Sequence, residues 1–87
     1  MKDPLAEVFP CDFPIKVLGR RDAGLERAVT GIIERHTGPV ERHRLSVRSS
    51  TDGNYVALTV TVTARSRAQL DELYRELTAC EAVLMAL

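Results

Sequence analysis

Residues 54–64 read Asn-Tyr-Val-Ala-Leu-Thr-Val-Thr-Val-Thr-Ala. Positions 56, 58, 60, 62 and 64 are all apolar, whereas the intervening positions 59, 61 and 63 are threonines. A strand turns successive side chains to opposite faces, and β-branched residues favour an extended backbone. The stretch therefore predicts a β-strand with one buried and one polar face. Such a strand is typical of a two-layer α+β sandwich whose helices cover a single side of the sheet.

The residues before this strand predict a strand, a helix and a second strand. In residues 15–19 we expect Ile15 and Val17 to face the core and Lys16 and Leu18 to face away from it. A helix is expected from an N-cap at Asp22 to about residue 37, because apolar residues recur at helical spacing and Gly38-Pro39 then ends the pattern. A strand is expected at residues 42–50, with Leu45 and Val47 pointing inward. The turn formers of residues 49–54 connect it to the threonine-rich strand as a hairpin.

The residues after this strand predict a second helix and a last short strand. Ser66 and Gln69 form a capping box at the start of the helix, and residues 83–87 are expected to form the strand. The order is then β-α-β-β-α-β. Two right-handed crossovers give a ferredoxin-like sandwich with sheet order 4-1-3-2, in which the threonine-rich strand is central. We expect residues 1–12 to be a flexible leader and residues 13–87 to form a single domain.

The composition excludes several classes of protein. The chain has 87 residues, which suits one domain, and its twelve basic and twelve acidic side chains cancel. No global charge therefore draws it to nucleic acid or to a membrane surface. No apolar run is long enough to cross a bilayer, and the N-terminus lacks a signal-peptide core, so we expect a cytoplasmic protein. Cys11 and Cys80 match no metal or redox spacing and are expected to be free thiols.

The sheet face that the helices leave uncovered is the first candidate for a binding surface. Residues 42–67 contain five arginines and a single acidic residue, Asp52. A basic patch on this face would suit nucleic acid, but only Tyr55 offers an aromatic ring for base stacking, so nucleic-acid binding is kept as an alternative. A solvated face, or a contact with a partner protein or a second copy, is the simpler interpretation. The residues expected on this face are Lys16, Leu18, Arg44, Ser46, Arg48, Tyr55, Thr59, Thr61 and Thr63.

The turn before the first helix is the second candidate. Gly19, Arg20, Arg21 and Asp22 precede the helix N-terminus, where backbone donors and the helix dipole favour an anion. Acylphosphatases combine this fold with an arginine in a similar loop, but Asn54 lies in the distal hairpin, so such an enzyme is a less favoured alternative. Two histidines without a carboxylate cluster predict no metal site, and we expect no cofactor. His36, on the apolar stripe, is expected to be a partly buried, hydrogen-bonded core residue.

Several segments together resemble the bacterial YbeD-like proteins, a family of uncharacterised function. The resemblance covers roughly residues 9–87. It rests on Phe9-Pro10-Cys11-Asp12-Phe13-Pro14-Ile15-Lys16-Val17-Leu18-Gly19, on Arg35-His36, on Ser49-Ser50 with Gly53-Asn54-Tyr55, and on Ser66-Arg67-Ala68-Gln69-Leu70-Asp71 with Leu73-Tyr74-Arg75-Glu76-Leu77. The resemblance implies no catalytic residues.

Residues 19–25, Gly-Arg-Arg-Asp-Ala-Gly-Leu, are similar to the turn that opens the first helix of ACT regulatory domains. The resemblance implies an ACT-like fold and a turn that binds small effectors, often amino acids, at a dimer interface. Gly19, Arg20, Arg21, Asp22 and Gly24 are the corresponding positions. We therefore expect a non-enzymatic regulatory module. It would sense a small anionic metabolite or an amino acid at this turn, or contact a partner protein or a second copy through the sheet.

Overall fold

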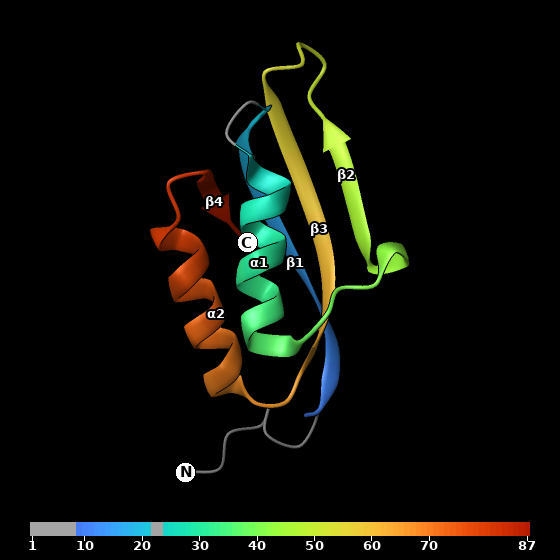
Figure 1. The fold of residues 1–87 in the computed structure, drawn as a ribbon, viewed down its shortest axis with the longest axis vertical. Coiled ribbons are helices and arrows are strands. Elements are labelled where there is room, and N and C mark those ends of the chain that lie inside the picture. The colour runs from blue at the N-terminus through green and yellow to red at the C-terminus, as the bar shows by residue number, and fades with distance from the viewer. Residues whose placement is uncertain (1–8, 22–23) are drawn as a thin grey trace.

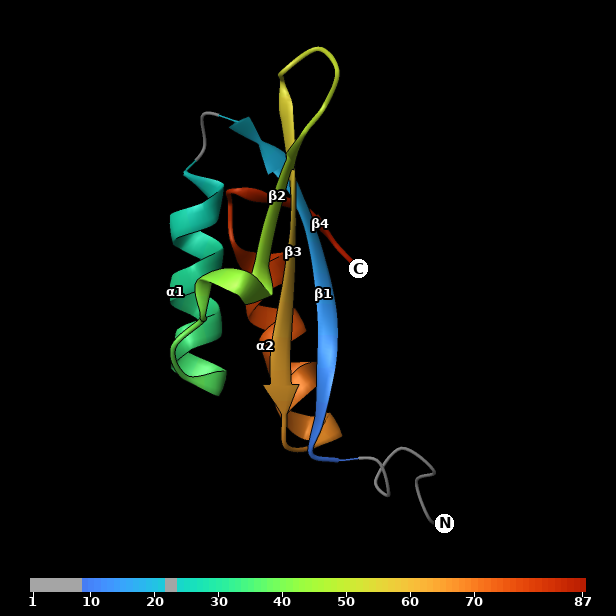
Figure 2. The same ribbon diagram turned by 90° about the vertical axis from the view of Figure 1, so that its right-hand side faces the viewer.

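The computed structural model describes residues 9–21 and 24–87 as one sheet covered on one side by two helices (Figure 1). The elements are β1 (Cys11–Arg20), α1 (Leu25–Thr37), the single 3-10 turn η3 (Arg42–Arg44), β2 (Leu45–Ser49), β3 (Tyr55–Ala64), α2 (Arg67–Ala79) and β4 (Val83–Ala86). The strands pair antiparallel in the order β2-β3-β1-β4. Both helices lie on the same side of the sheet (Figure 2). The predicted ferredoxin-like topology and the central place of the threonine-rich strand are confirmed.

The pairing of β1 with β3 is the longest in the sheet. It runs without interruption from Cys11 opposite Ala64 to Arg20 opposite Tyr55. The predicted alternation holds, since Ile15 and Val17 are fully buried beneath the helices. The helices contribute one apolar stripe each to this core, as expected from helical spacing. The buried residues are Ile15, Val17, Leu25, Val29, Ile32, Ile33, Leu58, Val60, Val62, Ala64, Leu70, Leu73, Leu77 and Val83.

Two strand boundaries differ from the prediction. β1 begins at Cys11, inside the expected leader, because Cys11 and Asp12 pair with the end of β3. Residues 1–8 lie outside the described part of the chain. β2 is shorter than predicted, because residues 42–44 form η3 rather than strand. Val47 was expected to point into the core, yet its side chain is 50% exposed, because β2 is an edge strand that the helices do not cover.

The first helix begins later than predicted. Its N-cap is Gly24, in the left-handed conformation at φ 66°, and not Asp22. A left-handed residue cannot continue a right-handed helix, so the first helical residue is Leu25. Asp22 and Ala23 lie outside the described residues. The helix ends at Thr37 as predicted, with the Gly38 N–H donating to the Glu34 carbonyl at 3.0 Å.

The capping residues of α2 also tie the two helices together. The Gln69 N–H donates to Ser66 Oγ at 3.1 Å, as the capping box predicts. The side chain of Gln69 differs from that motif, because its Oε1 accepts from the Arg65 N–H at 2.7 Å and its Nε2 donates to the His36 carbonyl at 2.6 Å. The end of α1 is thereby fixed to the start of α2.

An ion-pair cluster joins the same helices about two turns further along α2. Glu76 of α2 contacts His36 Nε2 with one carboxylate oxygen and Arg35 NH2 with the other. His36 is only 19% exposed, which confirms the prediction of a satisfied, partly buried histidine. The hydrogen bonds from His36 and Arg35 hold the pKa of Glu76 below its ordinary value of 4.5. The charged form of Glu76 is therefore favoured in the folded protein.

We expect Glu76→Gln to lower the free energy of unfolding at neutral pH and to have no effect in strong acid. A carboxylate with a lowered pKa stabilises the fold above its unfolded-state pKa, and this contribution is lost as the pH falls through the folded-state pKa. Urea unfolding of wild type and variant across a pH series measures the difference. Glu72→Gln, an exposed carboxylate on the same helix, is the control. A difference that persists well below pH 4.5 would show that Glu76 acts by packing alone.

Two glycines lie in opposite steric surroundings. Gly19 is buried in β1, where an added Cβ would lie 2.5 Å from the Ala82 carbonyl oxygen and 2.7 Å from a Leu25 methyl carbon. Its absent side chain therefore lets the β4 connection and the start of α1 approach the sheet. Gly31, in the middle of α1, would place a Cβ in open space. Close packing does not require glycine at Gly31.

We expect Gly19→Ala to destabilise the fold by about 1–3 kcal/mol or more, because the neighbouring atom at 2.5 Å is backbone and cannot rotate away. Gly31→Ala should stabilise it by roughly 0.5–1 kcal/mol, since glycine weakens a helix interior. Chemical denaturation of both variants tests the pair. Equal and small effects would mean that the sheet can shift to admit a methyl group at Gly19.

Candidate functional site

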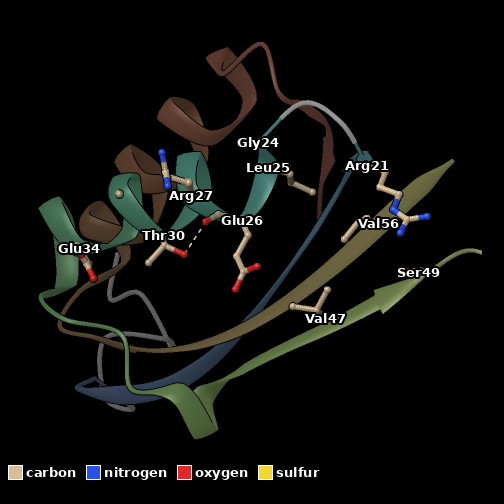
Figure 3. Close-up of a pocket in the computed structure, with 11 residues that line it drawn as sticks. Arg21, Gly24, Leu25, Glu26, Arg27, Thr30, Glu34, Val47, Ser49 and Val56 are labelled. Atoms are coloured by element: carbon tan, nitrogen blue, oxygen red, sulfur yellow. Dashed lines mark hydrogen bonds between the residues drawn. The ribbon is translucent and has the colours of Figure 1, made fainter. Parts of the chain in front are cut away.

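A groove lies between α1 and the strands β2 and β3 (Figure 3). Its volume is about 920 Å³. It is open to solvent because α1 packs mainly against β3 and α2, which leaves the edge strand β2 uncovered. The residues that line it are Arg21, Gly24, Leu25, Glu26, Arg27, Thr30, Gly31, Glu34, Val47, Ser49 and Val56. We refer to this hollow as the groove.

The groove has an apolar floor between charged ends. Val47 of β2 and Val56 of β3 point toward α1 from the strands, and Leu25 lies near Val56 (Figure 3). Glu26 points from the first turn of α1 into the space above Val47 (Figure 3). Glu34 lies further along the helix, so the helix wall is mainly acidic.

Arg21 supplies positive charge at the end of the groove beside the β2–β3 hairpin. Its backbone N–H donates to the Asn54 carbonyl at 3.1 Å, which fixes the residue against the β2–β3 hairpin. The guanidinium lies beside the same hairpin, within 3.3 Å of the position that a Cβ on Gly53 would take. No ion pair of Arg21 with a carboxylate occurs among the described residues. The groove thus combines a cation at one end with the carboxylate of Glu26 on the helix.

The start of α1 adds backbone donors to the same end. Gly24 has no side chain that could accept hydrogen bonds from the first-turn N–H groups. These groups carry the positive end of the helix dipole. Arg21 and Gly24 both line the groove, so a guanidinium and a helix N-terminus both contribute positive charge to it.

The structure separates the five residues that the sequence placed in the turn. Arg21 and Gly24 both line the groove. Gly19 is buried in β1 and Arg20 is an exposed strand residue on the other side of the sheet, because successive strand residues alternate faces. Asp22 lies outside the described residues. Glu26, Val47 and Val56 went unrecognised as site residues, since each matched an ordinary helix or strand position, and only the uncovered edge strand brings them together.

The sheet face opposite the helices, called the open face below, carries the residues predicted for it. Lys16 lies opposite Thr59, and Thr59 lies opposite Ser46. Lys16, Ser46, Arg48, Ala57 and Thr59 line a shallow depression of about 240 Å³ together with Val47. Tyr55 is 42% exposed. Thr61 follows further along β3, at the level of Pro14.

Arg44 lies at the end of the open face near the start of β1. It donates to both carboxylate oxygens of Asp12, at 3.2 and 3.4 Å, and Thr63 Oγ1 donates to Asp12 at 3.0 Å. These hydrogen bonds hold the pKa of Asp12 below its ordinary value. Arg44 is therefore already neutralised within the chain.

Residues 9–21 and 24–87 contain neither a cluster of metal ligands nor a membrane-spanning helix. No group of three or more histidine, cysteine or acidic side chains is placed to hold a metal ion there. None of the helices in that part of the chain is long and apolar enough to span a membrane.

Comparison with known sequences finds one family over nearly the whole chain. The profile described as "Protein of unknown function (DUF493)" matches residues 6–87. A UPF0250 protein of Paraburkholderia phymatum is 46% identical over 70 residues, which is 80% of this chain and 79% of the relative. A UPF0250 protein of Neisseria meningitidis is 39% identical over 79 residues, which is 91% of this chain and 87% of the relative. The resemblance to the YbeD-like proteins is confirmed.

Comparison with solved structures finds the same fold at low sequence identity. A solution structure of an H. pylori protein superimposes with a TM-score of 0.72 at 15% identity, covering 91% of this chain and 82% of the other. The ACT domain from GTP pyrophosphokinase of Chlorobium tepidum superimposes with a TM-score of 0.65 at 15% identity, covering 87% and 84%. The fold is therefore ACT-like.

Proposed function

The chain belongs to the DUF493 family, whose relatives are named UPF0250 proteins, and we propose that it is a non-enzymatic regulatory module that binds an amino acid in the groove. The observation that carries the proposal is the pairing of opposite charges across an apolar floor. Arg21 and the start of α1 offer positive charge, and Glu26 offers negative charge, within one hollow. A free amino acid carries a carboxylate and an ammonium group on a single carbon, so each of these groups would contact an opposite charge in the groove.

The charges of the groove favour an amino acid over a purely anionic metabolite. Two glutamates line the groove beside two arginines, and Arg27 points away from the strands (Figure 3). A phosphorylated ligand would place several negative charges near Glu26, which opposes binding. In the proposed pose the carboxylate contacts Arg21 and the first-turn N–H groups, and the ammonium group contacts Glu26. A small or medium apolar side chain would then rest on Val47 and Val56.

The fold supports the same proposal. The Chlorobium tepidum neighbour is an ACT domain attached to a GTP pyrophosphokinase, and ACT domains resemble this chain in the turn at residues 19–25. In the proposed function the chain reports the bound ligand to a separate protein.

We expect an amino acid to raise the melting temperature of the purified protein in a screen that also contains nucleotides and phosphorylated metabolites. A ligand that binds only the folded state stabilises it by about 2.7 kcal/mol at a hundredfold excess over its dissociation constant. Differential scanning fluorimetry followed by calorimetric titration gives the affinity. Stabilisation by phosphorylated compounds alone, or by nothing in the screen, would contradict the proposal.

Arg21→Ala should weaken the binding of that amino acid about tenfold or more, because a hydrogen bond to a charged group contributes roughly 1.5–3 kcal/mol. Arg20→Ala is the matched control, since this neighbouring arginine is the last residue of β1 and does not line the groove. The dissociation constants of the two variants are compared by calorimetry. Equal losses in both variants would indicate a nonspecific charge effect, and retained affinity in Arg21→Ala would remove the carboxylate contact.

Glu26→Gln tests the ammonium contact separately. The variant should bind the amino acid about tenfold or more weakly, yet bind the corresponding carboxylic acid without the amino group as well as wild type does. The comparison forms a double-mutant cycle between Glu26 and the ligand ammonium group. A coupling energy of zero would place the ammonium group elsewhere.

A further inference from the structure

Lys16 and Arg48 are two cations of the open face that border hydroxyl groups. Lys16 and Ser46 flank Thr59 in one row of side chains across three strands. Arg48 lies in the next row, beside Ala57. All four polar residues border the same depression of about 240 Å³. One ammonium group, one guanidinium group and two hydroxyl groups therefore border one depression, and together they can bind carboxylate or phosphate oxygens.

These two cations have no neutralising partner among the described residues. Arg44 on the same face is different, because it binds Asp12. Asp12 is the single acidic side chain on the open face in the described strands, and it lies at the far end of β1 from Arg48's row. The positive charge of Lys16 and Arg48 is thus left for a molecule outside the chain.

An aliphatic strip adjoins the two cations. Met85 lies opposite Leu18, and Leu18 lies opposite Ala57. Ala57 in turn lies opposite Arg48. Leu87 exchanges two backbone hydrogen bonds with Lys16, at 3.2 and 2.7 Å, so its side chain shares the face of Lys16. Met85 and Leu87 are 51% and 60% exposed. Exposed aliphatic groups beside unpaired charge are typical of a protein contact surface.

We propose that the open face binds an acidic, aliphatic segment of a partner protein. Its carboxylates would bind Lys16, Arg48 and the two hydroxyls, and its aliphatic side chains would cover Leu18, Met85 and Leu87. Charge complementarity identifies the occupant, because the open face offers unpaired cations, whereas Asp12, its one acid in the described strands, is bound by Arg44. This surface lies on the other side of the sheet from the groove, so it does not depend on an amino-acid ligand.

A second copy of the chain fits the open face less well. A two-fold axis through the face would bring its cations near those of the copy, with only the engaged Asp12 to offset them. Nucleic acid satisfies the cations but not the aliphatic strip, and Tyr55 is the one aromatic ring on the described open face. An acidic protein segment satisfies both halves of the surface.

The test is a selection of random dodecapeptides displayed on phage against the immobilised wild-type protein. Clones that also bind the double variant Lys16→Glu, Arg48→Glu are removed. We expect the enriched peptides to combine glutamate or aspartate with leucine, isoleucine or methionine. A synthetic peptide of the enriched sequence should bind wild type with an affinity that falls as salt rises, because the contact is partly ionic. The double variant should bind it at least tenfold more weakly.

The controls separate the possible occupants. Arg75→Glu reverses an exposed charge on α2 and should leave peptide affinity unchanged. Met85→Ser should weaken the peptide, and circular dichroism verifies that each variant folds. The proposal is overturned if no peptide is enriched, if the enriched peptides are basic, or if single-stranded RNA binds wild type as tightly as the peptide does. It is likewise overturned if the protein self-associates in light scattering and Lys16→Glu makes it monomeric.

Discussion

The ten-residue antiparallel pairing of β1 with β3 is the constraint on which the rest of the structure depends. It fixes which residues of each strand face the helices, because a slip of one residue would move every apolar side chain to the open face. Ile15 and Val17 from β1 then meet Leu58 and Val60 from β3 in one buried layer. The edge strands β2 and β4 attach to the outside of this pair, and both helices pack above it.

The helices cover the edge strand β4 but leave the edge strand β2 largely uncovered, and this difference produces the groove. α2 packs against β4, so the buried Val83 extends the core to that edge. α1 packs mainly on β3 and reaches little of β2, so Val47 remains half exposed at the other edge. An uncovered apolar strand next to a helix N-terminus leaves a hollow with an apolar floor and charged rims. The proposed binding of an amino acid follows from this asymmetry and from Arg21, which the hairpin holds in place.

The sheet separates two surfaces with different charge distributions. The groove combines arginines with glutamates, whereas the open face has the unpaired cations Lys16 and Arg48 beside an aliphatic strip. Arg21, which directly follows β1, lines the groove, and Lys16 of β1 lies on the open face, so this strand and its end connect the two proposed sites. A ligand in the groove would bind near one end of β1, and a partner would bind to its opposite face.

The amino-acid sequence alone determined the fold, because strand alternation and helical spacing are local patterns that residues 54–64 and the two apolar stripes display clearly. It also placed Lys16, Arg48 and Thr59 on one face, since period two fixes the faces of a strand once its core side is known. Which residues line the groove was decided only by the tertiary structure. Gly19 and Arg20 immediately precede Arg21 in the sequence. Gly19 is nevertheless buried and Arg20 lies on the open face, because β1 extends to Arg20. Glu26, Val47 and Val56 form one site only because α1 leaves β2 uncovered, and no local pattern records which strand a helix fails to cover.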